Sequence, residues 1–195
     1  MQAQKKDYIW NSIGSFLQSA ISPILLIVIT RLNGVGDSGL FSFAMSLSVV
    51  FWAISLWGGR TYQVSDVKKE FSSGDYIVVR FISSLIVAVF SISFCILSGY
   101  DLIKTELIMV LVSFKILESI ADSMYGVLQI HNKLYIVGIS LTIKSVFGFI
   151  IFAIVDILTK NIVYGALSIF LVNIVVVIFY DIPWMKHVES VGLTK

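Results

Sequence analysis

Hydrophobic residues in this chain gather into six long runs that are separated by short polar segments. The runs cover residues 9–30, 40–59, 81–97, 107–130, 135–158 and 162–180. Each run approaches or exceeds the roughly 20 apolar residues that a helix needs to cross a bilayer. The pattern predicts an all-α integral membrane protein with a six-helix transmembrane bundle. The membrane domain would cover residues 1–185, and residues 186–195 would form a short tail.

The fourth run differs from the others because it contains three charged residues, Lys115, Glu118 and Asp122. At about 100° per residue, these charges share one face of a helix with Tyr125 and Gln129. Each charge at the centre of a membrane helix costs about 2.5–3.5 kcal/mol on insertion scales. We therefore expect Lys115 to pair with Glu118, and the face to point into a wet or protein-lined interior. Two interpretations remain open, a polar clamp between helices and the lining of a transport pathway.

The first run also has a polar face. Asn11, Ser15, Gln18 and Ser22 recur at helical spacing, and Pro23 offers a break in the middle of the helix. Such residues either pack helices together through small polar groups or line a cavity.

The longest polar segment, residues 60–80, separates the second run from the third. Ser65 or Asp66 is placed to cap a short helix that continues through Phe71. Residues 72–75, Ser-Ser-Gly-Asp, would then break this helix before the next one begins.

Composition agrees with a multispanning membrane protein and excludes several other classes. The chain is 57% hydrophobic and 13% charged, with a mean hydropathy of +0.94. A net charge of +2 without a groove-reading motif gives no indication of nucleic-acid binding. Cys95 is the single cysteine, and His131 and His187 lack ligand or catalytic partners at useful spacing. We therefore expect no enzyme activity, no metal site and no bound cofactor.

The distribution of basic residues predicts the orientation in the membrane. With six spans, both termini lie on one side, together with two of the loops. That side has nine Lys and Arg residues and the other side has three. The nine are Lys5, Lys6, Arg60, Lys68, Lys69, Arg80, Lys133, Lys186 and Lys195; the three are Arg31, Lys104 and Lys160. Because cytoplasmic loops are enriched in Lys and Arg, both termini are predicted to be cytoplasmic.

Two blocks of residues resemble a known family. The first is Gly59-Arg60-Thr61-Tyr62-Gln63-Val64-Ser65-Asp66, followed by Tyr76-Ile77 and Arg80. The second is Lys115, Glu118-Ser119, Asp122, Tyr125-Gly126, Leu128-Gln129, Val137-Gly138, Ser140 and Lys144. In this order, the blocks resemble Wzx-type polysaccharide flippases of the MOP superfamily, which also contains the MATE exporters. The chain would correspond to the N-terminal lobe of a MATE-like transporter.

This resemblance implies a multi-pass protein of the bacterial inner membrane. It would export undecaprenyl-diphosphate-linked oligosaccharide repeat units for surface polysaccharides such as O-antigen or capsule. Lys115 and Lys144 would attract the diphosphate, while Asn11, Gln18 and Gln129 would contact the sugar.

The resemblance also assigns roles to carboxylates and to the cytoplasmic loop. Glu118 and Asp122 would carry a coupling proton or sodium ion. The loop motif comprises Arg60, Tyr62, Gln63, Asp66 and Arg80. In this motif, Arg60 and Asp66 would form either a structural contact or a gate on the cytoplasmic side.

Relatives of this type resemble two six-helix lobes around a central cavity, whereas six spans make one lobe. The sequence is therefore expected to be a truncated or split reading frame, or a half that assembles with a second six-span chain or with other polysaccharide assembly proteins. Two alternatives remain open. A MATE-like exporter of cations or drugs would have a cavity rich in carboxylates and aromatic rings, and a remnant of a flippase would have no activity.

Overall fold

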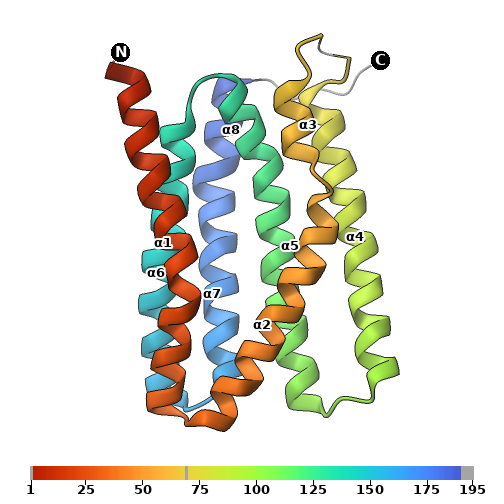
Figure 1. The fold of residues 1–195 in the computed structure, drawn as a ribbon, viewed down its shortest axis with the longest axis vertical. Helices are drawn as coiled ribbons and strands as arrows, with labels where there is room; N and C mark the ends of the chain where they lie inside the picture. The colour runs from red at the N-terminus through yellow and green to blue at the C-terminus, as the bar shows by residue number, and fades with distance from the viewer. Residues whose placement is uncertain (1, 69, 190–195) are drawn as a thin grey trace.

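The computed structural model describes residues 2–68 and 70–189, which form an antiparallel bundle of helices (Figure 1). The elements are α1 (Gln2–Leu32), α2 (Val35–Leu56), α3 (Gly59–Ser65), α4 (Ser73–Ser98), α5 (Leu102–Ile130), α6 (Leu134–Thr159), α7 (Ile162–Val176), the π-helical turn η1 (Val177–Asp181) and α8 (Ile182–Val188). The chain passes between the two ends of the bundle in α1, α2, α4, α5, α6 and the continuous α7–η1–α8. The expected all-helical fold is confirmed for the described residues.

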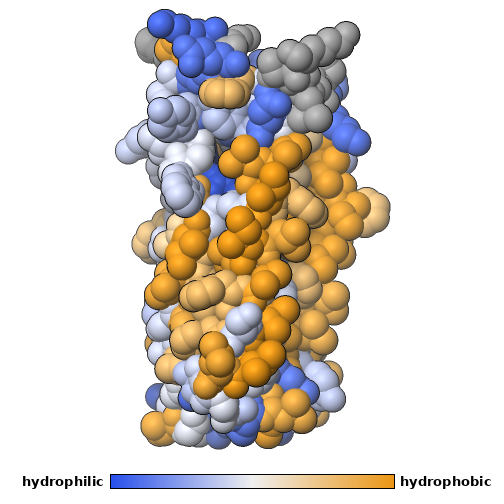
Figure 2. Space-filling model, turned by 90° about the vertical axis from the view of Figure 1, so that its right-hand side faces the viewer, coloured by the Kyte–Doolittle hydropathy of each residue, from blue (hydrophilic) through white to orange (hydrophobic). Residues whose placement is uncertain are grey.

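Most of these passes are apolar enough to cross a membrane. Five segments meet that description by length and composition: residues 5–32, 35–65, 73–98, 134–159 and 162–188. Helix α5 is not among them, and it carries the three charges in its middle. On the α4 side of the molecule, a broad apolar band separates polar residues at the two ends (Figure 2). A band of this kind matches the surface that a bilayer covers.

Two groups of helices lie side by side in the bundle. Helix α1 packs along α6, which packs against α7, and α5 packs against α2, α4 and α7. In Figure 1, α1, α6 and α7 stand on the left and α4 and α5 on the right, while α2 runs diagonally from the α1–α2 turn at the lower left to α3 at the upper right. Helices α1 and α2 meet at their connecting turn and diverge from it (Figure 1). Their divergence leaves the space that the candidate site occupies.

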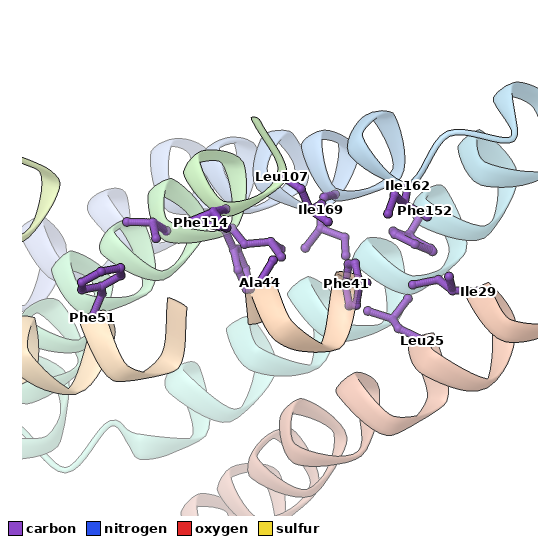
Figure 3. Close-up of a cluster of buried hydrophobic side chains, with 14 of the residues drawn as sticks. Leu25, Ile29, Phe41, Ala44, Phe51, Leu107, Phe114, Phe152, Ile162 and Ile169 are labelled. Atoms are coloured by element: carbon purple, nitrogen blue, oxygen red, sulfur yellow. The ribbon is translucent and has the colours of Figure 1, made fainter. Parts of the chain in front are cut away.

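The end of the bundle near the α1–α2 turn is held by a buried apolar cluster (Figure 3). Leu25 and Ile29 of α1, Phe41 of α2 and Phe152 of α6 meet in this cluster. The rings of Phe41 and Phe152 meet edge to face with centroids 5.9 Å apart. This geometry is the favoured one for aromatic pairs. The cluster therefore ties α1, α2 and α6 together where the first two helices join.

The structure contradicts the expected helix from Ser65 or Asp66 through Phe71. A short helix, α3, lies before Asp66 and ends at Ser65. The residues that were expected to break a helix instead begin α4. The Ser72 hydroxyl accepts a hydrogen bond from the Asp75 amide at 3.2 Å, and the Asp75 carboxylate accepts one from the Ser72 amide at 2.8 Å. This reciprocal capping box is a helix start signal, which explains why α4 begins at Ser73.

The helices at the two chain ends also differ from the simple expectation. Pro23 lies inside α1 without ending it. The last pass continues beyond the expected end at residue 180, because η1 leads directly into α8. Pro183 lies in the first turn of α8, where proline is tolerated. Residues 186–188 of the predicted tail belong to α8, and residues 190–195 lie outside the described residues.

Glycines let α1 and α6 approach closely. A Cβ atom added at Gly138 would collide with the backbone of Trp10 and Asn11, and one added at Gly14 would collide with the Gly138 carbonyl. Small residues of this kind set the packing distance between membrane helices. Gly148, on the same helix, has only ordinary space around it, since its nearest neighbour would be 3.8 Å away.

We predict that Gly138→Ala forces α1 away from α6 and destabilises the protein by about 1–3 kcal/mol, the usual cost of overpacking. The matched variant Gly148→Ala should leave stability nearly unchanged. Thermal unfolding of both variants in detergent measures the difference. Equal melting temperatures for the two variants would show that the close contact is not required.

Candidate functional site

The polar face of α5 lines a cleft inside the bundle. Two adjoining cavities of about 280 and 100 Å³ form it, and they share Gln18, Glu118, Leu141 and Lys144 as lining residues. The walls come from α1, α2, α5 and α6, with α7 closing the smaller cavity. The charged face that the sequence predicts for α5 therefore points into a protein-lined interior within this single bundle.

The first group in the cleft contains the predicted ion pair. Lys115 Nζ lies 2.7 Å from Glu118 Oε2. The Gln18 amide of α1 donates to the other carboxylate oxygen of Glu118 at 3.0 Å. Lys115 also lies 5.3 Å from the ring centroid of Trp52 on α2. This group links α5 to the first two helices across the cleft, and it confirms the i,i+3 pairing that the sequence predicts.

The second group places two arginines on one carboxylate. Asp122 accepts from Arg60 at 3.1 Å and from Arg80 at 3.3 Å. Arg60 also donates from Nε to Gln129 at 3.0 Å. Arg80 is only 4% exposed and donates to the carbonyl groups of Ser55 and Leu56 at the end of α2. The group therefore joins α3 and α4 to α5 at the α3 end of the bundle.

The third group is the most deeply buried. Lys144 Nζ lies 2.6 Å from Asp181 Oδ2 and donates to the Tyr125 hydroxyl at 2.7 Å. The side chains of Lys144 and Asp181 are 7% and 0% exposed. The Tyr125 hydroxyl also lies 3.0 Å from the Ser140 hydroxyl. One ion pair thus joins α6 to the π-helical turn between α7 and α8.

The remaining predicted residues occupy different surroundings. Asn11 lines the larger cavity near Arg60 and Asp122. Gln63 is buried beside Gly126, where an added Cβ would collide with its amide. Both amide atoms of Gln63 lack a hydrogen-bond partner among the described residues.

Two members of the loop motif lie apart from the cleft. Tyr62 is 74% exposed. Asp66 accepts hydrogen bonds from the Glu70 and Phe71 amides and from the Tyr76 hydroxyl at 3.0 Å. These contacts order the polar segment before α4. The structure thus separates Arg60, which lines the cleft, and Arg80, which reaches it only through Asp122, from Tyr62 and Asp66, which do neither.

Sequence reasoning missed two buried carboxylates. Asp181 lies just beyond the sixth apolar run, which ends at residue 180, yet it is the partner of Lys144. Asp156 lies within the fifth apolar run, and its carboxylate accepts a hydrogen bond from the Asn33 amide at 2.6 Å. Asn33 lies in the turn between α1 and α2, where its side chain gives no periodic signal. In both pairs the two residues are far apart in the sequence, so no local pattern reveals that they meet.

Sequence reasoning also missed a set of buried serines that packs the arginine end. The hydroxyl of Ser55 on α2 lies 2.9 Å from that of Ser84 on α4 and 2.7 Å from that of Ser119 on α5. Small polar side chains that meet across membrane helices allow close packing and satisfy each other's hydrogen bonds. Spacing alone would not distinguish these three serines from those on lipid-facing positions.

The cleft combines hydrogen-bonding groups with charges that are already compensated. Lys115 and Lys144 each have one carboxylate partner, whereas Arg60 and Arg80 share Asp122. The arginine group therefore retains one net positive charge. Among the described residues, no group of three or more His, Cys, Asp or Glu side chains could hold a metal ion.

We predict that removing one member of the Lys144–Asp181 pair is more harmful than removing both. Lys144→Met would leave the Asp181 carboxylate buried without a cation, at a cost of about 3–5 kcal/mol. The double variant Lys144→Met/Asp181→Asn should recover part of this loss, because no uncompensated charge remains. Thermal unfolding of the two single variants and the double variant measures the coupling.

The exposed residue Lys160 supplies the control, since Lys160→Met should not change the melting temperature. Strictly additive effects of Lys144→Met and Asp181→Asn would contradict a buried ion pair.

Comparison with known proteins gives one distant relative. The chain is 26% identical over 157 residues to a capsular polysaccharide biosynthesis protein, CapF, of Staphylococcus aureus. The match covers 80% of this chain and 38% of the relative, so this chain spans well under half of that protein's length. No protein-family model matches the chain, and no solved structure matches it significantly. The chain is therefore a multi-helix membrane protein with a distant relative named for capsular polysaccharide biosynthesis.

Proposed function

We propose that this chain forms a flippase lobe that moves undecaprenyl-diphosphate-linked oligosaccharide repeat units from the inner to the outer leaflet. The single observation that carries the proposal is the polar cleft between the diverging helices α1 and α2. It brings Gln18, Lys115, Glu118 and Lys144 together inside an otherwise apolar bundle. The distant relative is named for biosynthesis of a surface polysaccharide, which supports the same context.

The chemistry of the cleft suits such a substrate. A diphosphate forms strong hydrogen bonds with cations, and a sugar needs amide and hydroxyl partners. The cleft offers Lys115 and Lys144 for the former and Asn11 and Gln18 for the latter. The isoprenoid chain needs no polar partner and would remain in the lipid. The cleft would therefore have to accept only the polar part of the substrate.

The ion pairs suggest how binding and release would be balanced. A diphosphate that approaches Lys115 competes with Glu118, which lies only 2.7 Å away. A proton or sodium ion that binds Glu118 would weaken this competition and leave Lys115 available to the substrate. We therefore propose Glu118 as a coupling residue whose occupancy opposes that of the phosphate.

Asp122 is proposed to act at the cytoplasmic gate. It joins Arg60 of α3 to α5 and receives Arg80 of α4. Breaking these contacts would free the short helix α3 from the end of α5. Alternating access requires contacts that open at one end of the cavity while the other end closes.

We propose that the protein lies in the bacterial inner membrane with both termini in the cytoplasm. The beginning of α1, helix α3 and helix α8 share one end of the bundle (Figure 1). That end contains most of the Lys and Arg residues that the positive-inside rule places in the cytoplasm.

Reporter fusions after Lys195 test the orientation. A green fluorescent protein fused there should be fluorescent, because it folds in the cytoplasm, while alkaline phosphatase fused at the same position should be inactive. Fusions after Asn161, in the turn between α6 and α7, should give the opposite result. Active phosphatase after Lys195 would overturn the proposed topology.

Transport is tested in cells whose surface polysaccharide depends on this protein and on any second half that completes it. We expect Lys115→Ala and Asp122→Ala each to lower surface polysaccharide by about tenfold. Each variant loses charge-assisted hydrogen bonds, and losing about 1.4 kcal/mol of binding free energy is a tenfold effect. The control is Phe16→Ala, since Phe16 is 72% exposed on α1. Immunoblotting confirms that each variant is inserted.

Wild-type polysaccharide in both charge variants, with normal protein levels, would contradict the proposed pathway. A loss of polysaccharide without accumulation of lipid-linked repeat units in the inner leaflet would contradict a flipping step.

A further inference from the structure

An apolar groove runs along the outside of the bundle between the end of α2 and the first half of α4. It has a volume of about 380 Å³. Its walls include Leu56 and Trp57 from the end of α2 and Val79, Ile82 and Ile86 from α4. Val79, Ile82 and Ile86 are 64%, 52% and 62% exposed. The α4 side of the molecule carries the apolar band of Figure 2, so this groove opens toward the lipid.

A cationic pocket adjoins one end of this groove. The pocket measures about 210 Å³ and is lined by Leu56, Gly58, Gly59, Arg60, Thr61, Arg80 and Asp122. Leu56, Gly59 and Arg80 line both the groove and the pocket. Arg60 and Asp122 also line the larger cavity of the cleft. The pocket therefore lies between the lipid-facing groove and the polar interior.

The charges in this pocket favour an anion. Two guanidinium groups share the single carboxylate of Asp122, so one positive charge is left over. Arg80 is fixed in place, because it also donates to the Ser55 and Leu56 carbonyls. The Arg60 side chain is 28% exposed, and its second terminal nitrogen makes no hydrogen bond to the described residues. Arg60 can therefore offer a free donor to an incoming group.

Two glycines keep the pocket open beside the arginines. A Cβ added at Gly59 would lie 3.0 Å from Arg80 Nη2, and one added at Gly58 would enter open space. Gly58 has φ +63°, a conformation that side chains other than glycine rarely adopt. The backbone thus presents little bulk at the point where a headgroup would reach Arg60.

We propose that the groove and pocket together bind an isoprenoid carrier lipid, with its phosphate against Arg60 and its chain along α4. This inference rests on the proposed function for the identity of the lipid and adds a binding place outside the cleft. The continuity of an apolar groove with a cationic pocket matches a molecule that has a long hydrocarbon chain and an anionic end. From this place, the headgroup faces the cleft through Arg60 and Asp122, so the site is a lateral entrance for the substrate.

Lipid binding to the purified chain tests the site without requiring transport. The chain is reconstituted in phosphatidylcholine nanodiscs, and binding of undecaprenyl phosphate is measured by native mass spectrometry. We expect Arg60→Gln to weaken binding about tenfold, as the loss of a charge-assisted contact predicts. Arg60→Lys should retain part of the affinity. Ile82→Trp should also weaken binding, because it fills the groove.

Matched variants and ligands separate specific from general effects. Arg31→Gln and Ile92→Trp alter an exposed arginine and an exposed α4 isoleucine outside the site, and both should bind normally. Undecaprenol should bind more weakly than undecaprenyl phosphate, since it lacks the anion. Phosphatidylglycerol should not compete at equal concentration. Val79→Trp replaces Ile82→Trp if the latter fails to fold, as judged by thermal unfolding.

Any of three results would overturn the site. These are unchanged binding in Arg60→Gln, equal effects of Ile82→Trp and Ile92→Trp, and competition by phosphatidylglycerol at equal concentration. The proposed function is judged separately. Normal lipid binding in a protein that does not flip its substrate would refute the transport proposal, while lost transport with unchanged binding in Arg60→Gln would refute the lipid site.

Discussion

The need to compensate charges on α5 inside an apolar bundle is the constraint on which the rest of the structure depends. Lys115, Glu118 and Asp122 together would cost about 7–11 kcal/mol if each lay unpaired at the centre of a membrane. Every one of them has an oppositely charged partner. The partners come from α5 itself, from α3 and from α4. The charges therefore decide which elements must approach α5.

This compensation also shapes the space next to α5. Helices α1 and α2 are joined by a short turn and held there by the cluster around Phe41 and Phe152, and they diverge toward the arginine end. The divergence leaves room for the polar side chains and for the cleft. At the same end, the arginines that neutralise Asp122 also reach the pocket beside α4. The paired charges, the polar cleft and the arginine-lined pocket beside α4 thus arise from one arrangement of helices.

The predictable parts of the structure are those that rest on local periodicity. The six passes follow from apolar runs, and the Lys115–Glu118 pair follows from helical spacing three residues apart. The start of α4 could also have been predicted, since Ser72 and Asp75 have the spacing of a capping box. The same residues were instead interpreted as a helix break. Serine, glycine and aspartate occur at both breaks and starts, and only the side-chain hydrogen bonds distinguish them.

The rest of the site required the three-dimensional structure. Asp181 pairs with Lys144, which lies 37 positions earlier in the sequence. Asp181 is the last residue of a π-helical turn that no sequence pattern predicted. Arg80 was placed before the third span, yet the helix begins seven residues earlier and buries it against α2 and α5. Charged residues pair according to how helices pack, which periodicity within one helix does not determine.

The central claim is that the cleft beside α5 is polar and accessible from water in the membrane, and cysteine labelling tests it most directly. In a Cys95→Ser background, which removes the single cysteine, Ser15→Cys places a thiol on the cleft and Phe16→Cys places one on the outer face of α1. A charged, membrane-impermeant maleimide should label Ser15→Cys in inside-out vesicles and leave Phe16→Cys unlabelled. No labelling at Ser15→Cys, or equal labelling at both positions, would contradict a water-accessible cleft.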